Sequence, residues 1–153
     1  MQNREETIIE LPEIGLDFVN FGLNAAPGKI AASIPDTYIE NERLRIGAYR
    51  QLGDIHDQEK IKEFAEQLAD IFGKLPSETV NLLEIARLRI MLSRTRYRKL
   101  TVADDLVSIS APGGVVYRKN GIMPRLDHRD PPLLRIRQLQ HLVEVIAKEE
   151  AGD

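Results

Sequence analysis

The clearest periodic pattern lies between residues 57 and 73, where apolar residues recur every three or four positions. Such spacing turns one side of an α-helix towards a core and the other towards water. Asp57 can accept a hydrogen bond from the first turn, and Gly73 can end the last one. The sequence therefore predicts an amphipathic helix from Asp57 to Gly73. Its apolar positions are Ile61, Phe64, Ala65, Leu68, Ile71 and Phe72.

Two further helices are expected, one on each side of this helix. Before it, apolar residues four apart predict a helix over residues 40–52, with Gly53 in the left-handed conformation that commonly ends helices. After it, Ser77 can cap a third helix that runs to Leu92. Apolar residues on several faces predict that this third helix is largely buried at the centre of the fold. The spacing in the first helix comes from Leu44, Ala48 and Leu52.

Alternating positions after Arg98 predict strands. The period changes to two over residues 106–110 and 115–118, which flank a Pro-Gly-Gly turn. Asn120-Gly121 is a two-residue sequence that tight hairpins favour. We therefore expect a three-stranded meander, joined by residues 99–102.

The remaining segments complete the expected fold. Residues 1–12 are polar and weakly patterned, as in a flexible tail or a linker. Glycines and apolar residues between positions 14 and 34 predict two short strands around a Pro27-Gly28 turn. Asp130, followed by two prolines, can start a last helix with one apolar face. The order of elements predicts one α+β domain over residues 13–150, with helices packed on a small, mostly antiparallel sheet and a C-terminal helix.

Composition agrees with a globular domain. The chain has 153 residues, of which 42% are hydrophobic and 29% charged, and it contains no cysteine for disulfides or thiolate metal sites. No apolar run approaches the roughly 20 residues that span a bilayer, and the first residues lack a signal-peptide pattern. We therefore expect a cytoplasmic protein without a membrane partner.

The net charge of −3 hides an uneven distribution. Residues 36–84 hold 11 acidic and 6 basic side chains, whereas residues 85–99 hold six basic side chains and no acidic one. On the helix over residues 57–73, an acidic stripe runs opposite the apolar face. It is either a solvated surface or a docking surface for an arginine-bearing partner, and the sequence leaves both open. The stripe consists of Glu59, Glu63, Glu66 and Asp70.

The basic segment 87–99 could instead bind nucleic acid. Arginines beside an aromatic ring, here Tyr97, suit the phosphates and bases of single strands. Alternate positions on a helix point in different directions, however, so only some of these cations can share a face. A solvated or acid-paired surface is the commoner outcome. The possible nucleic-acid contacts are Arg94, Arg96, Arg98 and Lys99.

No catalytic or metal-binding pattern is evident. His56, His128 and His141 are too dispersed to suggest a metal site, and we expect neither a metal nor a cofactor. Residues 127–130 place carboxylates beside a histidine, which can serve proton transfer, but the prolines that follow are more typical of a loop and a helix cap. We expect no catalytic residues. The alternative is an enzyme whose pocket is assembled from distant residues.

Three segments carry a family resemblance. They are residues 34–39 (Ile-Pro-Asp-Thr-Tyr-Ile), 70–76 (Asp-Ile-Phe-Gly-Lys-Leu-Pro) and 82–89 (Leu-Leu-Glu-Ile-Ala-Arg-Leu-Arg). Through these motifs the chain resembles the C-terminal domain of bacterial transcription-repair coupling factors, and the resemblance runs without a gap from Tyr38 to Leu100.

Members of this family are multidomain, ATP-driven DNA translocases that dislodge stalled RNA polymerase and recruit the damage-recognition protein of nucleotide excision repair. The resemblance implies that this chain is their non-catalytic last domain, which folds back on the N-terminal repair-protein-binding module and autoinhibits it. RNA polymerase, DNA and the damage-recognition protein would be indirect partners. The residues implied in partner binding are Glu63, Glu66, Gln67, Asp70, Phe72 and Gly73.

The sequence departs from the family pattern at three positions. Gln67 stands where an acid is expected, Ile71 replaces the arginine of the Asp-Arg-Phe-Gly signature, and Arg96 stands where glycine is common. The C-terminal third also matches the family poorly. A clamp domain implies a translocase upstream in the same protein. A free-standing nucleic-acid-binding or protein-binding module that uses residues 87–99 is the alternative.

Overall fold

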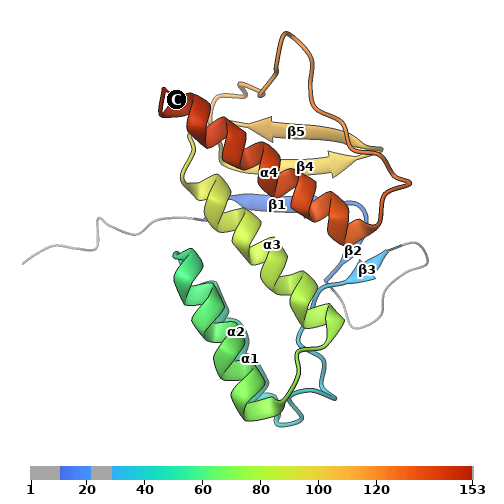
Figure 1. Cartoon of the computed structure of the whole chain (residues 1–153), viewed down its shortest axis with the longest axis vertical. Helices are drawn as coiled ribbons and strands as arrows, with labels where there is room; N and C mark the ends of the chain where they lie inside the picture. Colours follow the sequence, from blue (N-terminus) through green and yellow to red (C-terminus); the bar gives the residue numbers. More distant parts are fainter. Residues whose placement is uncertain (1–10, 22–28, 153) are drawn as a thin grey trace, which may run out of the picture.

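The computed structural model describes residues 11–21 and 29–152. Figure 1 shows a sheet with α3 and α4 packed on one face, and α1 and α2 on the far side of α3. The α+β class is thereby confirmed. In chain order the elements are β1 (Glu13–Leu16), β2 (Val19–Asn20), β3 (Ile30–Ala31), α1 (Glu42–Gly53), α2 (Gln58–Phe72), α3 (Ser77–Ser93), β4 (Lys99–Ala103), β5 (Leu106–Ser110) and α4 (Pro132–Glu150).

The main sheet is mixed, with the strand order β1-β4-β5. β1 runs parallel to β4, with Glu13 opposite Lys99, whereas β4 and β5 are antiparallel. β2 and β3 form a separate parallel pair. Buried and exposed residues alternate along β4 and β5, so one face of the sheet packs on the helices and the other does not.

The expected meander is wrong in its pairing. β5 lies where it was predicted, but its partner is β4, and the two are joined by a tight turn at Asp104 and Asp105. Both aspartates have positive φ angles, 50° and 69°, as two-residue hairpin turns require. Aspartate tolerates this conformation without being its usual sequence signal, so the turn was not predicted.

Residues 111–131 form an irregular loop rather than two strands. Val116 makes only an isolated bridge with Ser110. Asn120 and Gly121 do adopt the predicted left-handed turn, but its flanking residues form a single bridge and no longer strand. The turn therefore forms as predicted, but the residues on either side of it do not pair into strands.

The N-terminal segment has three short strands between Glu13 and Ala31, instead of the two expected within residues 14–34. The expected Pro27-Gly28 turn lies outside the described residues, as does most of the expected tail or linker over residues 1–12. The parallel pairing of β1 could not be recognised locally, since its partner β4 lies in another part of the chain.

The ends of α2 confirm the prediction. The side chain of Asp57 accepts a hydrogen bond from the Glu59 backbone N–H at 2.8 Å. At the other end Gly73, with φ at 96°, terminates the helix. Between them the apolar residues Ile61, Phe64 and Leu68 are buried.

Three other helix ends differ from the prediction. Gly53 keeps a helical conformation as the last residue of α1, and the left-handed cap expected there is absent. Pro76 rather than Ser77 occupies the N-cap of α3, and Pro131 rather than Asp130 that of α4. Proline is tolerated at the start of a helix because it lacks a backbone N–H, and an N–H there would have no acceptor within the helix.

α3 lies between two clusters of buried side chains, which confirms its central position. Leu88 and Leu92 face the sheet and α4, whereas Leu83 and Ile90 face α1 and α2. A helix that is covered on two sides needs apolar residues on several faces. In the described part of the chain, none of the helices has the length and apolar character needed to cross a bilayer.

Candidate docking site

The outer face of α2 presents a group of polar side chains that we call the α2 acidic surface. It consists of Glu63, Glu66, Gln67 and Asp70, all of them exposed. Their exposure follows from the burial of Ile61, Phe64 and Leu68 on the opposite side of the same helix. Sequence reasoning thus placed these four residues together, and the structure does bring them to one face.

The carboxylates of this surface are not neutralised. None of the ion pairs among the described residues involves Glu63, Glu66 or Asp70. Gln67 instead accepts a hydrogen bond from the Gln51 side chain of α1 at 3.4 Å. Among the described residues these three carboxylates therefore have no ion-pair partner, and Gln67 connects α2 to α1.

Asp70 strengthens the negative potential at the end of α2. It lies in the last turn, where no basic side chain is present. The helix dipole places a partial negative charge at this end, so a carboxylate here is unfavourable for the helix itself. Next to it, Ile71 is 71% exposed. The end of α2 thus combines two features. One is a carboxylate whose negative charge is unfavourable at the C-terminus of a helix, and the other is an exposed apolar side chain.

The turn after α2 is held by Tyr38. Its hydroxyl group donates to the Gly73 carbonyl oxygen at 2.6 Å and lies 3.1 Å from the Leu68 carbonyl oxygen. Its ring packs against Phe72 with a centroid distance of 5.8 Å, and burial raises the pKa of its hydroxyl. Phe72 is partly buried in this contact, so it supports the turn, and Gly73 shapes it.

The basic segment 87–99 does not form one open cationic face. Arg87 pairs with Glu84, and Arg96 lies 3.9 Å from Glu150. Tyr97, the expected stacking platform, is only 3% exposed. The side chains of Arg94, Arg96, Arg98 and Lys99 are exposed, but Arg94 donates to the His56 carbonyl oxygen and Arg98 to that of Tyr97.

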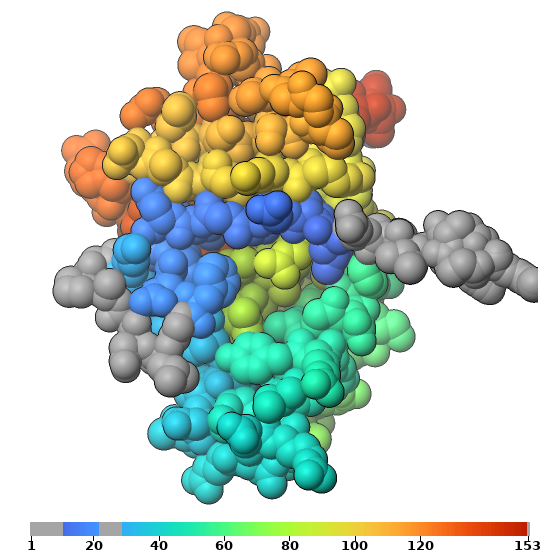
Figure 2. Space-filling model, turned by 180° about the vertical axis from the view of Figure 1, so that it is seen from behind, coloured from blue at the N-terminus to red at the C-terminus, as the bar shows by residue number. Residues whose placement is uncertain are grey.

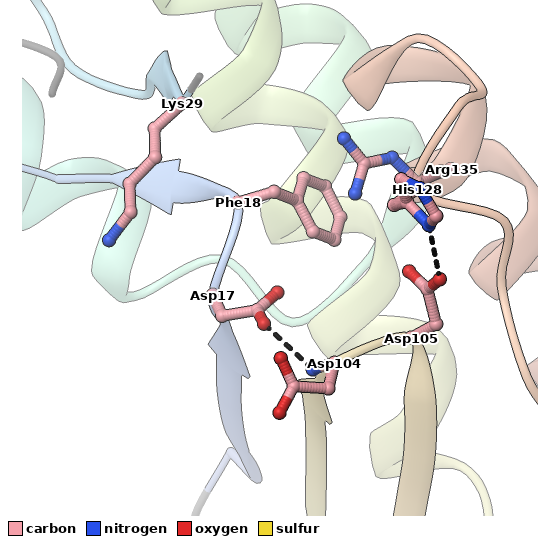
Figure 3. A pocket seen from close by; sticks show the side chains of 7 residues that line it. All are labelled: Asp17, Phe18, Lys29, Asp104, Asp105, His128 and Arg135. Atoms are coloured by element: carbon pink, nitrogen blue, oxygen red, sulfur yellow. Dashed lines mark hydrogen bonds and ion pairs between the residues drawn. The ribbon is translucent and has the colours of Figure 1, made fainter. Parts of the chain in front are cut away.

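A polar depression of about 410 Å³ lies at the tip of the β4–β5 hairpin (Figure 3). Asp17 accepts a hydrogen bond from the Asp104 backbone N–H at 2.9 Å. Asp105 faces His128, with 2.8 Å between Oδ2 and Nδ1, and this hydrogen bond lowers the pKa of the Asp105 carboxyl. Arg135 lies over the Phe18 ring. Lys29 comes from the opposite side, beside β3.

This depression was missed by sequence reasoning because its residues come from four separate segments. Only His128 had been noted, for its acidic neighbours. In the structure its carboxylate partner is Asp105, whereas Asp127 pairs with Arg129 at 2.8 Å. Residues 127–130 therefore form a loop before α4, as expected. Among the described residues, no group of three or more histidine, cysteine or acidic side chains could hold a metal ion.

Comparison with known proteins relates the chain to one family. The family model described as TRCF domain matches residues 29–114, more than half of the chain. The transcription-repair-coupling factor of Rickettsia prowazekii (strain Madrid E) is 30% identical over 97 residues, which cover 63% of this chain and 8% of that protein. That of Borreliella burgdorferi is 31% identical over 108 residues, or 60% of this chain and 10% of that protein.

The fold has a counterpart among solved structures. A crystal structure of the C-terminal domain of transcription-repair coupling factor superimposes with a TM-score of 0.66 at 18% identity, covering 91% of this chain and 96% of that one. At this identity the likeness concerns the fold alone. The chain spans about a tenth of the curated relatives it matches. The family match ends at residue 114, before most of the loop and before α4.

Proposed function

This chain belongs to the TRCF domain family, and from that premise we propose that it is the regulatory C-terminal domain of a transcription-repair coupling factor. In this proposal the α2 acidic surface docks on the N-terminal repair-protein-binding module of the parent protein and keeps that module covered. The chain itself is non-catalytic. ATP-driven DNA translocation, removal of stalled RNA polymerase and recruitment of the damage-recognition protein belong to the rest of the parent protein.

The observation that carries the proposal is the unpaired negative charge on α2. Glu63, Glu66 and Asp70 lie exposed on one face without an ion-pair partner among the described residues, although the exposed Lys60 and Lys62 belong to the same helix. The rigid turn at Gly73 fixes where this face ends. A partner that presents arginines can satisfy these carboxylates with charge-assisted hydrogen bonds.

Such an interface suits a reversible clamp. Complementary charges at exposed sites speed association and define orientation, but they contribute modestly to affinity and are screened by salt. The clamp can therefore open when another interaction rearranges the parent protein. With Gln67 in place of an expected acid, Glu63 and Glu66 supply the neighbouring charge.

The nucleic-acid-binding alternative has weaker support. The buried Tyr97 cannot stack on a base, and Arg87 and Arg96 already have acidic neighbours. We keep DNA as a parallel ligand in the test, since the exposed side chains of Arg94, Arg98 and Lys99 could still contact phosphates.

The test is a calorimetric titration of this chain with the separately expressed N-terminal module of the same organism, at low and at physiological salt. Duplex DNA is titrated in parallel. We expect saturable binding to the module that weakens as salt rises. Binding to DNA alone would reject the clamp in favour of the free-standing module, and binding to neither ligand would reject both.

A further inference from the structure

The guanidinium group of Arg89 is the most unusual charged group in the described residues. Its Nε is buried, and it is the only buried side-chain polar atom among them without a hydrogen-bond partner. No hydrogen bond or ion pair of the described residues satisfies the rest of the group. Burial without a counter-ion lowers the pKa of Arg89, although the side chain stays charged at neutral pH.

Arg89 lines an apolar pocket of about 270 Å³ between α1, α3 and the N-terminal strands. Figure 2 shows this face, where side chains of α3 are visible in a hollow between the segment before residue 22 and α1. The walls are aliphatic, and Arg89 is the charged residue among those that line it. The main wall residues are Ala32, Leu52, Leu82, Ile85, Ala86 and Ile90.

A charged group in such surroundings requires compensation. Apolar walls cannot replace the hydration that a guanidinium group loses on burial, and a missing partner costs more in a low dielectric than in water. The group that best matches a guanidinium in charge and shape is a carboxylate, which can accept two parallel hydrogen bonds from it. The pocket is therefore chemically complementary to a carboxylate on an apolar stem.

We propose that this pocket binds the side chain of a glutamate or aspartate in a segment of a partner protein, with an apolar residue next to it in that segment. The carboxylate pairs with Arg89, and the apolar neighbour covers the rim. This site takes an acidic partner, opposite in sign to the α2 acidic surface, and does not depend on the clamp proposal.

The rim indicates a protein segment rather than a small molecule. Phe21 is 48% exposed and Tyr49 is 39% exposed at the edge of the pocket. The Tyr49 hydroxyl accepts a hydrogen bond from the Ile34 backbone N–H at 2.7 Å, which holds this side of the rim in place. A ligand small enough for the pocket would leave these side chains in water, whereas a peptide can bury them.

The test uses the isotope-labelled full chain and backbone NMR shifts with three probes. The first is the N-acetylated, C-amidated tripeptide Leu-Glu-Leu, the second is its Leu-Gln-Leu counterpart, and the third is 3-phenylpropionate as a free acid. We expect the Glu peptide to shift amides around Ala86 and Arg89 and to bind about ten-fold more tightly than the Gln peptide, as one charge-assisted contact provides.

Two variants assign the binding to the pocket. Arg89→Met removes the cation, and we expect it to reduce affinity for the Glu peptide about ten-fold, to the level of the Gln peptide. Gly53→Leu leaves the charge in place and fills the mouth, because a side chain at Gly53 meets open space and its φ angle is not positive. Arg94→Met, which removes an exposed arginine, is the matched control and leaves binding unchanged.

Four outcomes would overturn the proposal, and the first three concern the pattern of binding. They are equal affinities for the Glu and Gln peptides, binding of the free acid without the peptide, and Glu-peptide binding that survives both pocket variants. The fourth is the absence of any chemical-shift change at peptide concentrations of several times the Kd expected for weak binding, about 1 mM. None of these results bears on the α2 acidic surface, whose ligand is the basic module.

Discussion

Two arginines of this fold lose much of their hydration in different ways. Arg135 is only 7% exposed, but its Nε donates to the Asp130 carbonyl oxygen at 3.0 Å and its guanidinium group lies 4.1 Å from the centroid of the Phe18 ring. Within residues 11–21 and 29–152, Arg89 has neither kind of contact. The first arrangement offsets the cost of burial, whereas the second leaves it uncompensated until a partner arrives.

The residue Arg89 therefore opposes the stability of the free chain. We expect Arg89→Met to raise the free energy of unfolding by about 1 kcal/mol, at the low end for removal of a buried charge because part of the group still reaches solvent. Arg135→Met is the matched control and lowers stability by a similar amount. Urea unfolding measures both. A loss of stability in Arg89→Met would contradict the uncompensated charge.

The Asp105–His128 contact predicts a specific pH response. The hydrogen bond with His128 lowers the pKa of the Asp105 carboxyl in the folded chain. This hydrogen bond therefore makes its full contribution to stability above the unfolded-state pKa of about 3.9. That contribution is lost as the pH falls through the lower folded-state value. NMR titration of the Asp105 carboxyl measures this pKa, which we expect to rise in His128→Ala. An unchanged titration would refute the contact.

At the scale of the element, α2 is defined by its ends as much as by its apolar face. Gly73 has a φ angle of 96°, a conformation that L side chains rarely adopt, although a side chain there would meet open space. We expect Gly73→Ala to destabilise the chain by about 1–2 kcal/mol for backbone reasons alone.

Gly53→Ala provides the comparison for this variant. Gly53 has a helical conformation, and a side chain there would also meet open space. We therefore expect Gly53→Ala to raise the free energy of unfolding by about 0.5 kcal/mol. Thermal or urea unfolding of the two variants gives the contrast. Equal effects at the two positions would show that the left-handed turn does not restrain Gly73.

At Asp70 the stability of α2 and its proposed docking role have opposite requirements. Because the carboxylate lies at the negative end of the helix dipole, we expect Asp70→Asn to stabilise the free chain by about 0.5 kcal/mol and to weaken binding to the basic module. Unfolding and calorimetric titration of the same variant measure the two effects. A variant that is both less stable and equally tight in binding would contradict this account.

The sequence predicts α2 and its surroundings well because the signals there are local. Helical spacing, the cap at Asp57 and the turn at Gly73 each act within a few residues. The pairing of β1 with β4 has no local signal, since Glu13 meets Lys99 only in the folded chain. The turn at Asp104 and Asp105 was not predicted from the sequence. The strands that were predicted on either side of Asn120-Gly121 do not form.

The candidate sites divide in the same way. The α2 acidic surface could be predicted because its residues follow a single helical period. In the sequence, Arg89 is the last residue of a family motif and one of several cations in a basic segment, and neither interpretation indicates its burial. Its burial depends on Leu52 of α1 and Ala32 after β3, which reach the same pocket from other parts of the chain. Charge counts along the sequence cannot distinguish an exposed arginine from one whose Nε is buried by folding without a partner.

At the scale of the whole molecule, α3 connects the two faces that we propose as docking surfaces. Its one side packs with α2, which carries the acidic surface, and Arg89 on the same helix lines the apolar pocket. The sheet and α4 cover its other side. The molecule therefore offers one surface suited to a basic partner and one suited to an acidic segment, both supported by the same central helix.

The most direct measurement is the affinity of a double charge reversal, Glu66→Arg with Asp70→Arg, for the N-terminal module at low salt. The matched control reverses two exposed acids elsewhere, Glu13 at the start of β1 and Glu144 on α4, so that both variants have the same net charge. We expect a loss of affinity of several-fold or more in the first variant and little change in the second. Equal affinities for the two variants would contradict α2 as the docking surface.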